Sequence, residues 1–126
     1  MVEEKPPLSQ VVPVLVAVLV CDTAVADPGT GKRSLIGIFN IINARAFPIP
    51  QPMTLYMKLA DAQGYYELEV RFIQVKTGNQ LVTAKGELKI DDRLSSVDLH
   101  LSFPSLLIPE EGKYEFQIWA NSVFLG

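Results

Sequence analysis

Apolar and polar residues alternate along the middle of this chain, most clearly in seven consecutive positions. These are Tyr66, Glu67, Leu68, Glu69, Val70, Arg71 and Phe72. Because successive side chains of a strand point to opposite faces, this period of two predicts a β-strand with one apolar and one polar face. The same period recurs in Met53–Leu59, Val82–Ile90, Val97–Phe103 and Tyr114–Ile118. The chain is therefore predicted to be all-β.

Turn-forming residues divide the chain into eight predicted strands. These are Val11–Cys21, Ser34–Ile42, Met53–Ala60, Tyr65–Lys76, Gln80–Ile90, Ser95–Phe103, Tyr114–Ala120 and Val123–Leu125. Seven to eight antiparallel strands at this spacing favour an immunoglobulin-like β-sandwich, and a closed barrel is the alternative. We expect residues 1–10 to be a flexible N-terminal tail and residues 11–126 to be a single β-sandwich domain.

The first two predicted strands, Val11–Cys21 and Ser34–Ile42, are apolar at nearly every position. For Val11–Cys21, this pattern predicts a central place in a sheet that is covered on both faces. The segment Phe47–Pro52 follows them and contains three prolines. Since proline cannot donate a hydrogen bond to a ladder, this segment is predicted to be an extended crossover between two sheets.

Other irregular positions give further predictions about the connections. The alternation changes phase after Phe72, which predicts a β-bulge near Phe72 and Ile73. Asp61–Gly64 is predicted to be a tight hairpin turn. Pro104–Gly112 is predicted to be a longer loop whose apolar residues fold back over one end of the sandwich.

Composition limits the classes of function. The chain has 126 residues, of which 48% are hydrophobic and 20% charged, as expected of one globular domain. A net charge of −3 with scattered basic residues argues against a nucleic-acid partner. Its one cysteine, Cys21, cannot form an internal disulfide, which favours a reducing cytoplasm.

The N-terminal region also resembles a signal peptide. Val11–Val20 is apolar, and Ala24–Ala26 has the small-x-small form of a cleavage site. The leader is more acidic than basic, however, and Pro13 interrupts the apolar run. The run is shorter than the roughly 20 residues that span a bilayer, so no membrane span is expected. We favour a retained strand in a cytoplasmic protein; the alternative is an exported protein whose residues 1–26 act as a signal peptide.

Two motifs suggest chemistry at first sight. Asp27–Lys32 resembles a phosphate-binding loop, but Ala26 and Arg33 stand where that loop needs glycine and a hydroxyl residue. It is therefore predicted to be a hairpin turn. His100 is the only histidine and alternates with apolar residues, so we expect a solvated histidine on a polar face. No Gly-x-Ser-x-Gly elbow is present to build a hydrolase site around it.

Acidic residues gather in or near the predicted connections. They are Asp22, Asp27, Asp61, Asp91, Asp92, Glu110 and Glu111. Some β-sandwiches bind calcium with carboxylates from loops at one end, because this cation takes six to eight oxygen ligands. No spacing within one loop resembles a calcium loop, so we nominate no metal ligand. A carboxylate site for a metal ion or small ligand remains an alternative.

Two aromatic residues are predicted to lie on the polar faces of their strands. Trp119 alternates with Tyr114, Phe116 and Ile118, and Tyr56 lies between the apolar positions of its own strand. Large rings on an outer face stabilise strands by cross-strand packing, and they are also common in protein interfaces and carbohydrate sites. Trp119 and Tyr56 are therefore the candidate binding residues.

Several strand and turn segments together resemble a family of small bacterial proteins of unknown function. They are Val18–Asp22, Gly31–Phe39, Phe47-Pro48 and Gly112–Phe116. The resemblance covers most of the chain from Val14, and it implies a β-sandwich domain with no catalytic residues to assign. It also favours Val11–Cys21 as a retained strand. Independently of the resemblance, Gly37 is expected to allow a close approach of neighbouring groups.

These observations favour a protein that binds or assembles without chemistry of its own. The first hypothesis is an interaction module that meets a protein partner, or its own copy, through an outer sheet face or an open strand edge. The second is the loop-end ligand site described above. A hydrolase ranks last, because no nucleophile, base and orienting group can be named together. We expect no enzyme activity and no cofactor.

Overall fold

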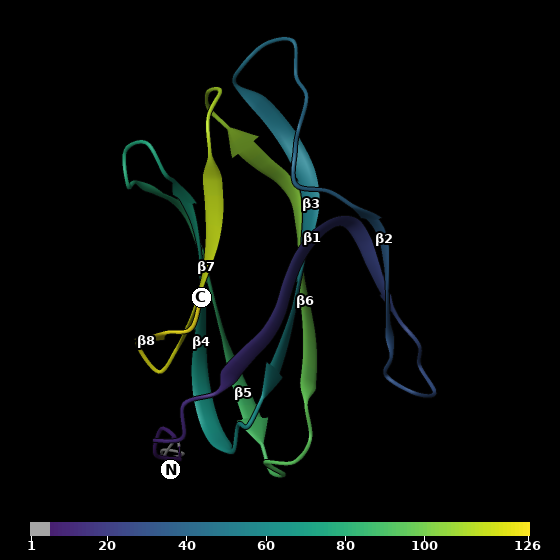
Figure 1. Ribbon diagram of the computed structural model, residues 1–126, viewed down its shortest axis with the longest axis vertical. Coiled ribbons are helices and arrows are strands. Elements are labelled where there is room, and N and C mark those ends of the chain that lie inside the picture. Colours follow the sequence, from purple (N-terminus) through teal and green to yellow (C-terminus); the bar gives the residue numbers. More distant parts are fainter. Residues whose placement is uncertain (1–5) are drawn as a thin grey trace, which may run out of the picture. The chain divides into compact units, whose positions relative to one another are not determined.

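The computed structural model describes residues 6–126 and contains only β-strands in this range (Figure 1). The strands are β1 (Val14–Ala26), β2 (Arg33–Ile38), β3 (Ile49–Ala60), β4 (Gly64–Gln74), β5 (Gln80–Ile90), β6 (Val97–Ile108), β7 (Tyr114–Ala120) and β8 (Val123–Phe124). The prediction of an all-β chain is confirmed. Within this range no helix is long and apolar enough to cross a membrane.

The strands form two four-stranded sheets. One has the order β5-β4-β7-β8 and the other has the order β2-β1-β3-β6. Most of each sheet belongs to a separate compact unit of the chain. The first unit contains the described residues up to Leu15 together with Ala60–Ser96 and Gly112–Gly126, and the second contains Val16–Leu59 and Val97–Glu111.

Strand β4 shows how the alternating sequence determines local structure. Tyr66, Val70 and Phe72 are buried, whereas Glu67 on the opposite face is exposed. The pairing of β4 with β5 shifts register between Phe72 and Ile73, which confirms the predicted bulge. Phe72 also stacks on Tyr114 of β7 with ring centroids 5.4 Å apart.

The proline-rich segment is not a crossover between sheets, as its sequence suggested. Strand β3 begins at Ile49 and includes Pro50 and Pro52, and it lies in the same sheet as β2. The ladder between β3 and β6 shifts register just after Gln51, and proline is tolerated at strand starts and at bulges. The chain changes sheet between β3 and β4, so the predicted hairpin turn after Asp61 is also wrong.

Strand β6 is longer than predicted. It continues through Pro104 to Ile108, in place of the expected loop. The reason is its position at the edge of the sheet, where a missing backbone N–H does not break an inner ladder. Leu106 and Ile108 are buried as ordinary strand residues, while Leu107 between them is exposed.

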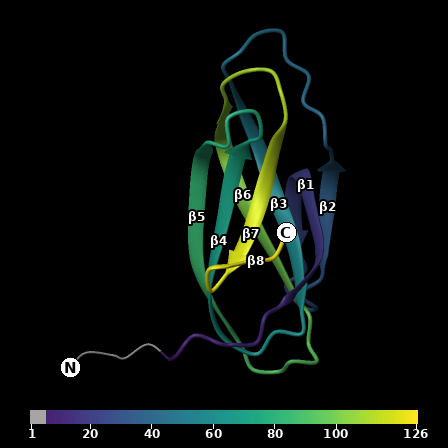
Figure 2. The ribbon, with the colours of Figure 1, turned by 60° about the vertical axis from the view of Figure 1, so that its left-hand side comes forward.

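The β1–β2 hairpin is not covered on both faces, contrary to the prediction from its apolar sequence. Val25, Ile36 and Ile38 are 52%, 55% and 59% exposed. Strand β2 lies at the outer edge of its sheet beside β1 (Figure 2). Strand β1 has the inner place in its sheet that was predicted for Val11–Cys21, whereas the largely apolar β2 lies at an edge.

The C-terminal part of the predicted N-terminal tail is hydrogen-bonded to β4. Met1–Lys5 lies outside the described residues, but the N–H of Ser9 donates to the carbonyl of Tyr65 at 2.9 Å. The side chain of Asn121 donates to the carbonyls of Ser9 and Tyr65 at 3.0 and 3.3 Å, and its Oδ1 accepts from the N–H of Glu67 at 2.8 Å. Asn121 therefore joins the chain before β1 to the beginning of β4.

Candidate interaction surface

The turn between β1 and β2 is closed by its own side chains. The N–H and the hydroxyl of Thr30 donate to Asp27 Oδ2 at 2.8 and 2.6 Å, and the N–H of Asp27 donates to the carbonyl of Lys32 at 2.8 Å. These bonds from Thr30 lower the pKa of Asp27. Gly31 has φ +73°, as this turn requires. The predicted hairpin is confirmed by the antiparallel pairing of β1 with β2. Asp27 binds the Thr30 amide, which a phosphate loop would offer to a ligand.

One face of this hairpin is apolar and open to solvent. In the register of the two strands, Thr23 lies opposite Ile36 and Val25 lies opposite Ser34. Both pairs share one face, and all four side chains are exposed. Ile38 extends the exposed aliphatic surface along β2.

The outer edge of β2 is unprotected as well as apolar. Within residues 6–126, β2 is paired with β1 alone. The residues Ser34–Ile38 include no charged side chain and no proline. Charges and prolines are the usual devices that prevent an edge strand from pairing with another chain. We call Ser34–Ile38 the open edge.

Asp22 lies over the C-terminal end of the open edge. Gly37 has φ +71°, and a Cβ atom built there would lie 2.2 Å from Asp22 Oδ2. The predicted close approach at Gly37 is therefore present, and the group that approaches is a carboxylate. A shallow hollow beside this point is lined by Asp22, Gly37, Ile38, Phe39, Ile41, Ile42, Asn43 and Gln51.

Arg33 anchors the other end of β2 to the same sheet. Its Nε donates to His100 Nδ1 at 3.0 Å, and its guanidinium also donates to the carbonyls of Asp98 and Gly31. His100 is thus a half-buried hydrogen-bond acceptor, and the prediction of a solvated histidine is corrected. The sequence concealed this contact, because Arg33 and His100 are 67 positions apart.

Tyr56 lies next to this anchor. Its hydroxyl donates to Asp98 Oδ1, and Lys58 Nζ lies 4.0 Å from the same carboxylate oxygen. Burial, with the hydrogen bond and the negative charge of Asp98, raises the pKa of Tyr56 to about 12. Tyr56 is half-buried, and its polar atom is already bonded within the chain.

Trp119 lies in the other sheet, so Trp119 and Tyr56 do not share a sheet face. The guanidinium carbon of Arg71 lies 4.1 Å from the centre of the Trp119 ring, and the ring of Phe124 packs at 5.2 Å. The indole N–H donates to Gln117 Oε1 at 3.3 Å. Trp119 is half-buried and is packed against its own neighbours.

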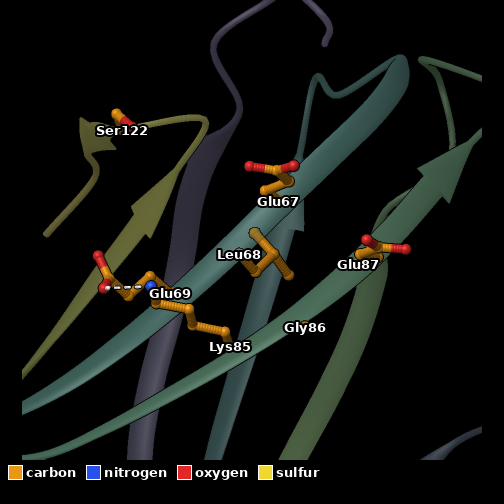
Figure 3. A pocket seen from close by; sticks show the side chains of 7 residues that line it. All are labelled: Glu67, Leu68, Glu69, Lys85, Gly86, Glu87 and Ser122. Carbon is orange, nitrogen blue, oxygen red and sulfur yellow. Dashed lines mark ion pairs between the residues drawn. The ribbon is translucent and has the colours of Figure 1, made fainter. Parts of the chain in front are cut away.

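A second hollow lies on β4 and β5, and sequence reasoning did not find it. Its lining residues are Glu67, Leu68, Glu69, Lys85, Gly86, Glu87 and Ser122 (Figure 3). Glu69 is paired with Arg71 at 2.6 Å and with Lys85 at 4.0 Å. In residues 6–126 there is no group of three or more His, Cys, Asp or Glu residues that could hold a metal ion.

Cys21 is enclosed. It is 0% exposed, and its thiol donates to the carbonyls of Thr23 and Thr54 at 3.3 and 3.6 Å. Burial, followed by the nearby charge of Asp22, raises the pKa of Cys21. A buried thiol with a raised pKa is a poor nucleophile.

The comparisons with known proteins agree with the resemblance found in the sequence. The model of a family of unknown function, DUF6941, matches residues 16–125. The chain belongs to this family. Its matched region begins inside β1 and includes both sheets. A search of curated proteins gives no match.

Proposed function

We propose that this protein is a non-catalytic interaction module that binds an extended segment of protein at the open edge of β2. The observation that carries this proposal is the combination of exposed aliphatic side chains and unprotected backbone at Ser34–Ile38. A strand added to a sheet edge gains main-chain hydrogen bonds and contacts with alternate side chains. The open edge offers both.

The absence of enzyme activity is part of the same proposal. Among the described residues, the two groups best suited to nucleophilic chemistry are both engaged. Cys21 is enclosed, and His100 Nδ1 accepts a hydrogen bond from Arg33 instead of from a hydroxyl nucleophile. A free thiol also supports the proposal of a cytoplasmic location.

The immunoglobulin-like arrangement remains part of the proposal. It is supported by the burial of alternate residues in each sheet, Leu55 and Met57 in β3 and Val70 and Phe72 in β4. The half-buried packing of Trp119 within its sheet favours a stabilising role for that ring. We therefore base the proposed contact on the strand edge.

The test is the binding of a labelled peptide of alternating valine and threonine, with lysine at its N-terminus and aspartate at its C-terminus. Antiparallel pairing brings this lysine to Asp22 and this aspartate to Lys32. Fluorescence anisotropy should show saturable binding to the wild type, weakened at least about tenfold by Ile36→Lys. Leu94→Asp is the control, because Leu94 is 95% exposed and lies far from β2 in the sequence. Equal binding by the Ile36→Lys variant would overturn the proposal.

A further inference from the structure

We infer that the occupant of the open edge is a second copy of this chain, paired antiparallel through β2 about a two-fold axis at Leu35. This inference rests on the proposed function and adds the identity of the partner. Two identical edges form a closed dimer only if the edge is complementary to itself in the antiparallel direction. Backbone, charge and side chains each meet this condition.

The backbone condition follows from the hairpin register. The N–H of Asp27 donates to the carbonyl of Lys32, so this pair is a hydrogen-bonded pair. Hydrogen-bonded and non-hydrogen-bonded pairs alternate along an antiparallel ladder, and Leu35 lies opposite Ala24 in a non-hydrogen-bonded pair. The N–H and C=O of Leu35 therefore point away from β1. Two copies can exchange both of these bonds at Leu35.

The charge condition follows from the two ends of the open edge. Lys32 precedes β2 and is exposed, whereas the carboxylate of Asp22 lies over Gly37 at the other end. Antiparallel pairing places Lys32 of each copy at the end of the paired edge where Asp22 of the other lies, with the two side chains on opposite faces of the sheet. Parallel pairing would bring like charges together, which is unfavourable across neighbouring strands. The charges thus favour the antiparallel direction.

The side-chain condition concerns the exposed face of the hairpin. With Leu35 on the axis, Ile36 of one copy lies opposite Ser34 of the other, and the two Ile36 side chains become diagonal neighbours. Diagonal neighbours on one face are about 7–8 Å apart, within reach of one another. The pairing therefore covers part of the aliphatic surface that Ile36 exposes in the single chain.

The first experiment measures mass by light scattering and sedimentation equilibrium over a wide concentration range. The wild type should rise from the mass of one chain to that of two. Ile36→Lys and Leu35→Pro should each weaken the dimer at least about tenfold, by adding a charge to the edge or by removing the outward N–H. Leu94→Asp should dimerise as the wild type does.

The second experiment tests the register. In the double variant Ser34→Cys/Ile36→Cys, the cysteine at position 34 of one copy lies opposite the cysteine at position 36 of the other. This is a non-hydrogen-bonded pair. Such pairs have Cα atoms about 4.5 Å apart, within the range of a disulfide. Mild oxidation should give a covalent dimer. Ser34→Cys alone is the matched control and should form little covalent dimer, because the two cysteines at position 34 of a dimer are not opposite each other.

The outcomes separate the inference from the proposed function. A dimer that Ile36→Lys disrupts and that the double-cysteine variant cross-links supports both. A chain that stays monomeric while binding the valine–threonine peptide overturns self-pairing and leaves the proposed function standing. A monomer that binds no peptide overturns both, and a dimer that Ile36→Lys and Leu35→Pro leave intact overturns the inference.

Discussion

The edge strands β5 and β2 expose side chains of opposite character to solvent. Strand β5 places Lys85, Glu87 and Lys89 at exposed positions along its length. Strand β2 carries Ile36 and Ile38 at its exposed positions instead. Alternating charges on an edge oppose pairing with another chain, whereas aliphatic side chains favour it. The comparison supports the proposal that β5 ends its sheet and that β2 pairs with a strand of another chain.

The two edges also differ in how their strands are held. Strand β5 pairs with β4 along its whole length from Gln80 to Ile90. Among the described residues, strand β2 pairs only with β1, and the side chain of Arg33, its first residue, is bonded to β6. The protected edge thus has a long ladder, and the open edge has a short ladder with a side-chain anchor.

The largest expected effect lies on the β5 side. Phe72→Ala should reduce the free energy of unfolding by about 3–5 kcal/mol, because a buried ring that packs on Tyr114 and Phe116 leaves a cavity. Chemical denaturation followed by circular dichroism measures the loss. A loss below about 1 kcal/mol would show that the sheet of β5 is not held by this packing.

A second test on the same side concerns the N-terminal junction. Asn121→Ala should cost about 1–3 kcal/mol, because it leaves the N–H of Glu67 and the carbonyl of Ser9 without their partner. Asn121 also has φ +49°, which alanine adopts poorly. Asn121→Gly, which removes the bonds but not the backbone freedom, separates the two contributions. Equal stability of the wild type and both variants would contradict the role of this junction.

On the β2 side, Gly37→Ala should cost about 1–2 kcal/mol from its positive φ alone. The clash of the new Cβ with Asp22 adds to this cost. In the double variant Gly37→Ala/Asp22→Ala, the part of the stability loss that comes from the clash should be recovered, and the part that comes from the positive φ should remain. Thermal unfolding of both variants measures the difference, and equal stabilities would show that Asp22 does not lie over Gly37.

The smallest expected effect concerns pH. Because the pKa of Tyr56 is raised to about 12 from an ordinary value of 10.0, its contribution to stability is complete below pH 10 and is lost as pH rises towards 12. Discounted for the partial exposure of Tyr56, this loss is about 1 kcal/mol. In denaturation experiments, the wild type should be more stable than Tyr56→Phe below pH 10, and this difference should shrink as the pH rises from 10 towards 12. Parallel pH profiles for the two proteins would exclude the contact with Asp98.

The local pattern of the sequence predicted much of the fold. The bounds of β5 and β7 and the bulge near Phe72 follow from alternation alone, because a strand with one buried face has a strict period of two. The β1–β2 hairpin follows from the chemistry of Asp27 and Gly31.

Position within a sheet was harder to predict. The inner place of β1 was predicted, but its sheet was also expected to be covered on both faces, because hydrophobicity indicates burial only on average. The exposed edge position of β2 was not predicted. The anchor between Arg33 and His100 depends on pairing between distant segments, which no local pattern contains. Prolines in β3 and β6 were misinterpreted for the same reason, since edges and bulges tolerate them.

The packing of Trp119 makes its intrinsic fluorescence sensitive to the state of the sheet that contains it. The chain contains one tryptophan, and its indole contacts Arg71 and Phe124 in the sheet of β4, β7 and β8. Intrinsic emission therefore records the opening of that sheet without any attached dye. The sheet that carries the open edge has no such fluorophore among its residues, so a tryptophan introduced at Tyr56 would supply the second optical signal.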